Sequence, residues 1–207
     1  MVSRHQAPES TVNTRETILD AAAALLAEGG FQGMTMDEVA RRAGLGKGTT
    51  YIYFESKRDL ALSVLDRMSH RLQERLRNIV RGNGTAEERL KRLIVERVMY
   101  RFDCAREYHA SLDEILSCLR PLLLDRRRAT MQQEAVIFVE LLVEGRTLGV
   151  FECDDPLRTA QAILTATAAL LPFSLSPAEL GSRKAVESRT LFLADLLIRS
   201  VLRKETR

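Results

Sequence analysis

Helix start and stop signals recur along this chain, and they restrict it to a helical fold. Between these signals, apolar residues repeat with the period of an α-helix, as from Ile18 to Leu26. No alternating pattern typical of a strand occurs, and Ala, Leu, Arg and Glu, which favour helix, dominate the composition. We therefore predict an all-α fold of about nine helices. The start signals are Thr35–Glu38, Ser56–Asp59, Thr85–Glu88 and Asp155–Pro156, and the stop signals are Gly29–Gly30, Gly44 and Gly82–Gly84.

The expected helices differ in length, which divides the chain into domains. Two of them, over about 36–43 and 47–54, are too short to be stable without support from their neighbours. We predict a flexible tail over 1–12, a three-helix helix-turn-helix domain over 13–60 and a helical regulatory and dimerisation bundle over 61–207. Within that bundle we expect helices over about 106–118, 122–145, 156–171 and 183–204.

Composition and charge indicate the cellular compartment of the protein better than they indicate its binding partner. The first residues are polar and lack the apolar centre of a signal peptide, and the sequence contains no run of eighteen apolar residues. Three cysteines, an odd and small number, fit a reducing environment. We expect a cytoplasmic protein that does not contact membranes. The net charge is only +3, so bulk charge does not indicate a nucleic-acid partner.

Local charge is more informative. The interval 41–58 contains a single acidic residue but five basic ones: Arg41, Arg42, Lys47, Lys57 and Arg58. The two short helices expected over about 36–43 and 47–54 are joined by a turn that contains Gly44. A small residue inside the first of them, Ala40, allows the second to approach closely. Two short helices with this spacing are typical of a helix-turn-helix motif.

The segment GLGKGTTYIYFESK, residues 44–57, is poor in residues that favour helix but rich in groups that can bind DNA. Its glycines allow close approach of the backbone to phosphates, and the hydroxyl, phenol and ammonium groups are donors. We expect Ile52 and Phe54 to anchor the helix, and both Thr49 and Thr50 to offer hydroxyls. Alternatively, the tyrosines are half-buried aromatics and the lysines are ordinary solvated charges.

With these residues in place, the chain from 12 to about 66 resembles the DNA-binding domain of the TetR (tetracycline-repressor) family of transcriptional regulators. The remainder resembles the family only in its helical architecture. The residues that carry the resemblance are Ile18–Ala22, Gly30–Phe31, Thr35–Ala40, Ala43–Gly44, Lys47–Phe54 and Ser56–Lys57.

The resemblance implies a homodimer that binds a palindromic operator in double-stranded DNA, most simply as a repressor released by an unknown small-molecule effector. It implies no cofactor and no metal. Two departures matter: Gly46 stands where the family often has a capping Ser, and Tyr53 stands where His is frequent. The implied DNA contacts are Thr35, Lys47, Gly48, Thr49, Tyr51, Tyr53 and Lys57.

In the bundle, two apolar stripes are candidates for the dimer interface, and the alternative is that they form the chain's own core. The stripes are Ala160, Ile163, Leu164, Thr167, Ala168 and Leu171, and Thr190, Leu193, Leu197 and Val201. An effector pocket is implied by the resemblance alone. Its candidate lining residues, each of which could equally be core, are Met99, Phe102, Tyr108, Leu116, Cys118 and Phe138.

The sequence gives little support for catalysis, because its histidines share no metal-binding spacing and no phosphate-binding or nucleophile motif occurs. We therefore expect a regulator and not an enzyme. Two rival interpretations stay open: a helical interaction protein that does not bind DNA, and a small all-helical enzyme that uses a cavity in the bundle.

Overall fold

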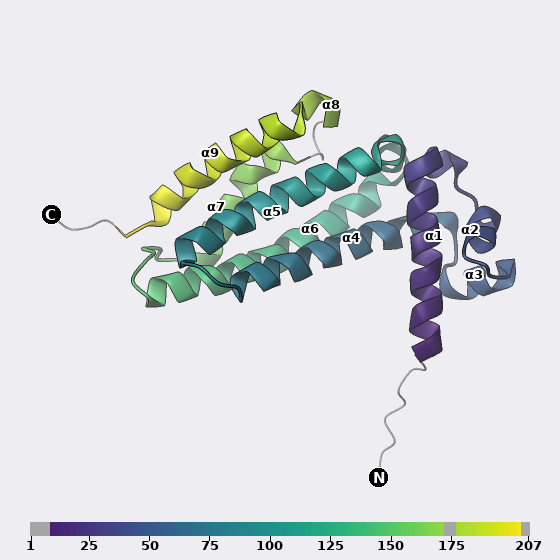
Figure 1. Cartoon of the computed structure of the whole chain (residues 1–207), viewed down its shortest axis with the longest axis horizontal. Coiled ribbons are helices and arrows are strands. Elements are labelled where there is room, and N and C mark those ends of the chain that lie inside the picture. Colours follow the sequence, from purple (N-terminus) through teal and green to yellow (C-terminus); the bar gives the residue numbers. More distant parts are fainter. Residues whose placement is uncertain (1–8, 172–176, 204–207) are drawn as a thin grey trace, which may run out of the picture. The chain divides into compact units, whose positions relative to one another are not determined.

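The all-α prediction is confirmed by the computed structural model (Figure 1). The model describes the backbone of residues 9–171 and 177–203 and, within these ranges, the side chains of 13–108, 124–171 and 179–203. The described ranges contain helices and one isolated β-bridge, between Phe151 and Leu202, but no strand. The chain divides into two compact units, one formed by 1–68 and 108–118 and the other by 69–107 and 119–207.

The first unit contains α1 (Glu9–Gly33), α2 (Met36–Arg42), α3 (Lys47–Tyr53) and the beginning of α4 (Lys57–Val80). Residues 9–12, which the sequence analysis placed in the tail, are part of α1. As predicted, a glycine breaks this helix: Gly30 has φ 75°. The Arg67 guanidinium fastens α4 to α1, because it donates to the Asp20 carboxylate at 2.7 Å and to the Leu19 carbonyl at 3.1 Å.

The second unit contains the rest of α4 together with long helices that run lengthwise along one another (Figure 1). Their buried faces carry Leu, Ile, Val and Phe at helical spacing and form the core. These elements are α5 (Ala86–Glu107), α6 (His109–Thr147, of which the part from 119 lies in this unit), α7 (Pro156–Ala166), the 3₁₀ turn η1 (Thr167–Leu170), α8 (Pro177–Leu180) and α9 (Arg183–Val201).

Helix boundaries in this part of the chain differ from prediction in three places. A single helix, α6, replaces the two expected over 106–118 and 122–145, because Pro121 removes one backbone donor without ending the helix. The helix after Asp155 is α7, which ends at Ala166 and continues as η1. The last helix ends at Val201 because the Arg203 N–H donates to the Val150 carbonyl, 3.0 Å away.

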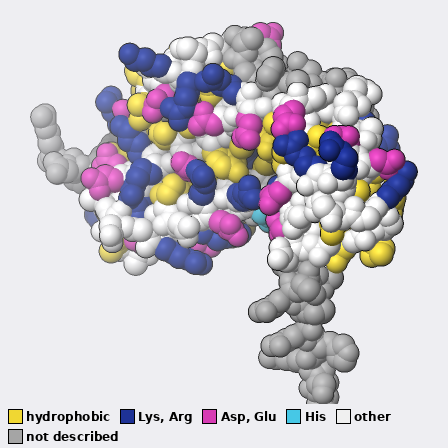
Figure 2. All heavy atoms as spheres, turned by 45° about the vertical axis from the view of Figure 1, so that its right-hand side comes forward, with side chains coloured by type: hydrophobic (Ala, Val, Ile, Leu, Met, Phe, Trp, Pro, Cys, Tyr) yellow, Lys and Arg dark blue, Asp and Glu magenta, His cyan; other side chains and the backbone are white. Residues whose placement is uncertain are grey.

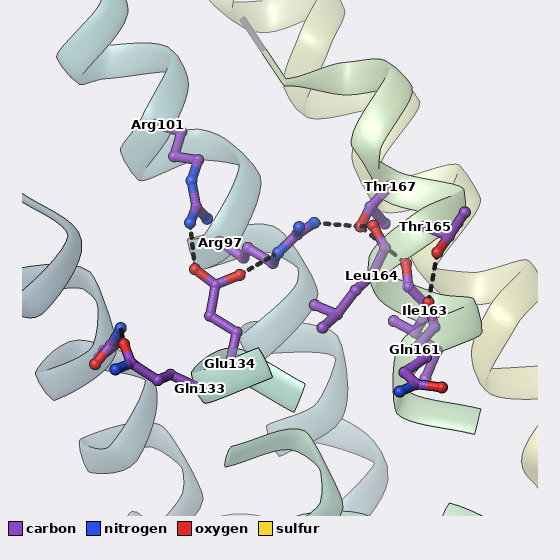
Figure 3. Close-up of polar contacts among 10 residues, drawn as sticks. Arg97, Arg101, Gln133, Glu134, Gln161, Ile163, Leu164, Thr165 and Thr167 are labelled. Atoms are coloured by element: carbon purple, nitrogen blue, oxygen red, sulfur yellow. Dashed lines mark hydrogen bonds and ion pairs between the residues drawn. The ribbon is translucent and has the colours of Figure 1, made fainter. Parts of the chain in front are cut away.

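A buried ionic network connects α5, α6 and α7 (Figure 3). The Glu134 side chain is fully buried and accepts hydrogen bonds from Arg97, at 2.8 Å, and from Arg101. Arg97 also donates to the Thr167 hydroxyl at 2.6 Å. That hydroxyl in turn lies 2.9 Å from the Ile163 carbonyl, so the network fixes the point where α7 changes to 3₁₀ geometry.

We predict that Glu134→Gln destabilises the protein strongly, because it leaves two guanidinium groups in the core without their counter-charge. Breaking a buried ion pair costs about 3–5 kcal/mol of unfolding free energy. Urea denaturation at pH 7 measures this loss. Glu140→Gln, on the exposed face of the same helix, is the control and should change the free energy by less than about 0.5 kcal/mol.

The pH dependence of stability in wild type and Glu134→Gln gives a second test of the network. Burial acts to raise the pKa of the Glu134 carboxyl, but Arg101 and Arg97 outweigh it and hold that pKa below its usual value. A lowered folded-state pKa stabilises the fold above the unfolded pKa of about 4.3, and this contribution is lost as the pH falls through the folded value. Wild type should therefore lose more unfolding free energy below about pH 4.3 than Glu134→Gln; equal losses would contradict this role.

Candidate DNA-binding interface

The turn between α2 and α3 has the geometry expected of a helix-turn-helix. At the start of α2, the Thr35 hydroxyl accepts the Glu38 N–H at 3.1 Å, as the capping box predicts. At its end, Gly44 has φ 68°, and the Leu45 N–H donates to the Ala40 carbonyl at 2.9 Å. This left-handed glycine reverses the chain within a few residues and directs it into α3.

Two buried side chains seat α3 in the first unit. Thr50 is fully buried and Phe54 nearly so, and because they are four residues apart they lie on the same side of the helix. The Arg15 guanidinium lies 5.2 Å from the centre of the Phe54 ring. Four other residues of α3 are exposed, and of these Gly48 and Ile52 lie opposite the buried pair: Lys47, Gly48, Tyr51 and Ile52.

The orientation of α3 corrects two predictions. Ile52, expected to anchor the helix, is 81% exposed. Thr50, expected to offer its hydroxyl, is buried, and no partner for that hydroxyl occurs among the described residues. The physical reason is the helical period of about 100° per residue: Ile52 is two positions from both Thr50 and Phe54 and therefore points away from them. The prediction that Phe54 anchors the helix is confirmed.

Among the expected DNA contacts, Thr35 is the N-cap of α2, and Lys47 and Gly48 are the first two residues of α3. The Lys47 ammonium is 2.7 Å from the Asp37 carboxylate and so joins the two helix starts. Hydrogen bonding to Asp37 raises the pKa of Lys47. Lys47 is therefore charged at neutral pH, but it already has a counter-ion on the protein.

The remaining residues expected to contact DNA differ in their exposure to solvent. Tyr51 is exposed, whereas Thr49 and Tyr53 are half-buried. Lys57 is also half-buried, and its ammonium donates to the Gln32 carbonyl at 3.1 Å and lies 4.6 Å from the centre of the Phe31 ring. In this conformation Lys57 supports the end of α1.

Charges of one sign do not dominate the surface of the protein. On the face that Figure 2 shows, Lys and Arg side chains alternate with Asp and Glu. This agrees with the small net charge of +3. Any selectivity for DNA would have to come from local contacts.

Four of the six candidate effector residues have described side chains, and all four are buried. Met99 and Phe102 lie in one buried cluster of the second unit, and Phe138 lies in another. Tyr108 is buried in the first unit. The Leu116 and Cys118 side chains lie outside the described residues. Met99, Phe102 and Phe138 are part of the hydrophobic core, and their contact with an effector stays a prediction.

Most of the expected dimer stripe is also core, which is the alternative left open above. Its side chains on α7, η1 and α9 point into the chain's own interior, so they offer little surface to a second copy. Only Ala168, Leu193 and Leu197 are partly exposed. The buried members are Ala160, Ile163, Leu164, Thr167, Leu171, Thr190 and Val201.

Sequence reasoning missed the large apolar residues of α7 and α9 that are exposed. Among them, Phe192 is 68% exposed. The signal was present in the sequence, since α9 has apolar residues at 191, 192 and 196 as well as in the predicted stripe. The exposed residues, which we call the outer face, are Leu157, Leu191, Phe192 and Leu196.

The described residues contain little reactive chemistry. They include no group of three or more potential metal ligands, and none of their helices is long and apolar enough to span a membrane. Burial raises the pKa of the Cys104 and Cys153 thiols, so both are protonated and weakly nucleophilic at neutral pH.

Comparison with known proteins agrees with this geometry. Residues 18–64 match the model of a family described as bacterial regulatory proteins, tetR family. The chain is 32% identical over 77 residues to the fatty acid metabolism regulator protein of Bacillus subtilis, covering 37% of this chain and 40% of that protein. It is 35% identical over 86 residues to the HTH-type transcriptional repressor KstR of Mycolicibacterium smegmatis, covering 42% of each.

The whole-chain likeness is structural. The transcriptional regulator FadR from Bacillus subtilis, solved in complex with stearoyl-CoA, aligns with a TM-score of 0.63 at 21% identity, covering 88% of this chain and 97% of FadR. At this identity the likeness shows the fold. In sequence, the chain spans about two fifths of the length of the two curated relatives described above.

Two short helices joined by this turn, within a three-helix unit, form a helix-turn-helix motif. The matched residues contain all of α2 and α3, the part in which the geometry is most distinctive. Residues 18–64 of the chain are therefore similar to the bacterial regulatory proteins of the tetR family.

Two glycines of the motif should respond to alanine in opposite directions. Gly44→Ala places a side chain at φ 68° and should lower the unfolding free energy by about 1–2 kcal/mol. Gly48→Ala lies within a helix and meets no atom within 4 Å, so it should raise that free energy by about 0.5–1 kcal/mol. Chemical denaturation of both variants measures this difference; a Gly44→Ala protein as stable as wild type would contradict the turn geometry.

Proposed function

We propose that the protein is a sequence-specific DNA-binding transcriptional regulator, in the simplest case a repressor. The observation that carries the proposal is the exposed surface of α3, which presents Lys47, Gly48, Tyr51 and Ile52, while Thr50 and Phe54 are buried and anchor the helix. The family match over 18–64 supports it. A helix of this width fits the major groove, which is about 12 Å wide. The matched family is bacterial, and bacterial DNA lies in the cytoplasm, so we propose that the protein acts there.

We further propose that the protein acts as a homodimer through the outer face of α7 and α9. An exposed apolar patch on a protein usually indicates an interaction site. Two copies related by a twofold axis would each present one α3, with the two about 34–36 Å apart, to a palindromic operator. This assignment replaces the buried stripe predicted from the sequence.

An effector would regulate binding by favouring a different separation of the two α3 helices. Only its differential affinity for the two arrangements can drive this change. α4 runs without a break from Lys57 to Val80 and is the segment through which we expect the change to pass. The stearoyl-CoA bound to FadR suggests acyl-CoA compounds as the first to test. Native mass spectrometry of the purified protein, searching for a co-purified small molecule, tests this proposal.

The first test concerns the phosphate contact of Lys47. Lys47→Ala should weaken binding to a selected operator, and its plot of log affinity against log salt concentration should be shallower by about one unit. Fluorescence anisotropy over a salt series measures this slope. Lys184→Ala, at an exposed position of α9, is the control. An unchanged slope for Lys47→Ala would remove Lys47 from the phosphate contacts.

The second test concerns the dimer. Phe192→Asp places a charge at the most exposed apolar residue of the outer face and should weaken the dimer at least about 30-fold, the loss typical of an interface hot spot. Sedimentation equilibrium measures the dissociation constant. Leu148→Asp, at an exposed position outside α7 and α9, is the control. A dimer that survives Phe192→Asp unchanged would place the interface elsewhere.

The rival interpretations make different predictions. An interaction protein without DNA binding would select no sequence from genomic fragments. An all-helical enzyme would turn over a bound metabolite, although the described residues contain no metal cluster and their two cysteines have raised pKa values. Selection of genomic fragments by the purified protein therefore tests the proposed function directly.

A further inference from the structure

Ile52 is the most exposed large hydrophobic side chain among the described residues, at 81%. Nothing in the fold explains an isoleucine there. It adds nothing to the core, and a β-branched residue is a poorer helix former than the polar alternatives Lys, Gln or Glu. In a helix of only seven residues that preference matters, because the helix has little intrinsic stability.

The neighbourhood of Ile52 restricts what could cover it. In the described part of the first unit, the exposed large hydrophobic side chains are Tyr51 and Ile52, both on α3. The other exposed apolar residues belong to α6, the turn that follows it, α7 and α9 in the second unit. Two adjacent side chains on a short helix are too small a patch for a stable protein interface, which buries about 800 Å² on each partner.

Gly48 is the second feature of this surface. It lies four residues before Ile52 and therefore on the same side of α3, one turn toward the N-terminus. A helical side chain leans toward the N-terminus and lies over the preceding turn, which for Ile52 is the turn that contains Gly48. A Cβ built at Gly48 meets no atom within 4 Å, so the fold does not require glycine there. The missing side chain leaves the surface beside Ile52 open to close approach.

The chemistry of the major groove then identifies the contact. Most groups on base edges are hydrogen-bond donors or acceptors, and the apolar exception is the C5-methyl group of thymine. We propose that Ile52 is a specificity-determining residue that contacts a thymine methyl group in each half of the operator, with Gly48 providing the clearance. This inference rests on the proposed function, because it requires α3 to lie in the major groove.

The experiment removes the methyl group and leaves every hydrogen-bonding atom in place. Each thymine of a selected operator is replaced, one position per half-site at a time, by deoxyuridine, and affinity is measured by anisotropy. For wild type, one position should weaken binding about fourfold for each half-site altered, the value of one buried methyl group. Replacing that thymine–adenine pair by a cytosine–guanine pair should weaken binding further, and a 5-methylcytosine–guanine pair should restore part of the loss.

Variants of Ile52 assign the methyl contact to this side chain. Ile52→Ala should bind the thymine and deoxyuridine operators with nearly equal affinity, and Ile52→Val should give an intermediate ratio. If Ile52→Ala binds too weakly to measure, the ratio for Ile52→Val decides. Leu148→Ala, an exposed apolar residue of the second unit, is the control and should keep the wild-type ratio.

The possible failures are distinguishable. If wild type selects no DNA, the proposed function fails and the assignment of Ile52 fails with it. If wild type binds an operator but no deoxyuridine substitution weakens binding, only the role of Ile52 is overturned. The same holds if Ile52→Ala and Ile52→Val both keep the full wild-type preference for thymine.

Discussion

The seating of α3 by Thr50 and Phe54 is the constraint on which the rest of the proposed interface depends. A helix of seven residues has too few hydrogen bonds to persist alone, so its position is set by the side that it buries. Because two residues four apart supply that contact, the exposed positions of α3 are not needed for it. This is why glycines, tyrosines and an exposed isoleucine can occupy a helix for which their intrinsic preferences are poor.

Much of this fold could be predicted from the sequence, because its helix ends have local causes. Thr35 caps α2, Gly44 turns the chain and Asp155 caps α7 as expected from neighbouring residues alone. Predictions failed where they depended on which side of a helix packs against the core. Seven residues are too few to fix which side of α3 is buried, and α7 and α9 are apolar on two sides, so periodicity could not tell the face covered by the chain itself from the face left exposed.

The ionic network of the second unit shows a different limit of prediction from sequence. Arg97 occurs at an inward position of α5, between Ile94 and Val98, and such a position is a sequence signal for a buried charge. The partners of Arg97 could not be predicted from the sequence, because Glu134 is 37 residues away and Thr167 is 70 residues away. Long-range pairing of this kind depends on how helices are arranged. The same network binds α7, one of the two helices that carry the outer face, to the interior of the bundle.

The ion pair between Lys47 and Asp37 has a consequence for how the protein would search DNA. A phosphate group must compete for the ammonium with a carboxylate of the protein, whatever the local sequence. This competition tempers the attraction to DNA at random sites, where charge is the principal contact. The sugar–phosphate backbone alone would then hold the protein only briefly, and long residence would require matching bases.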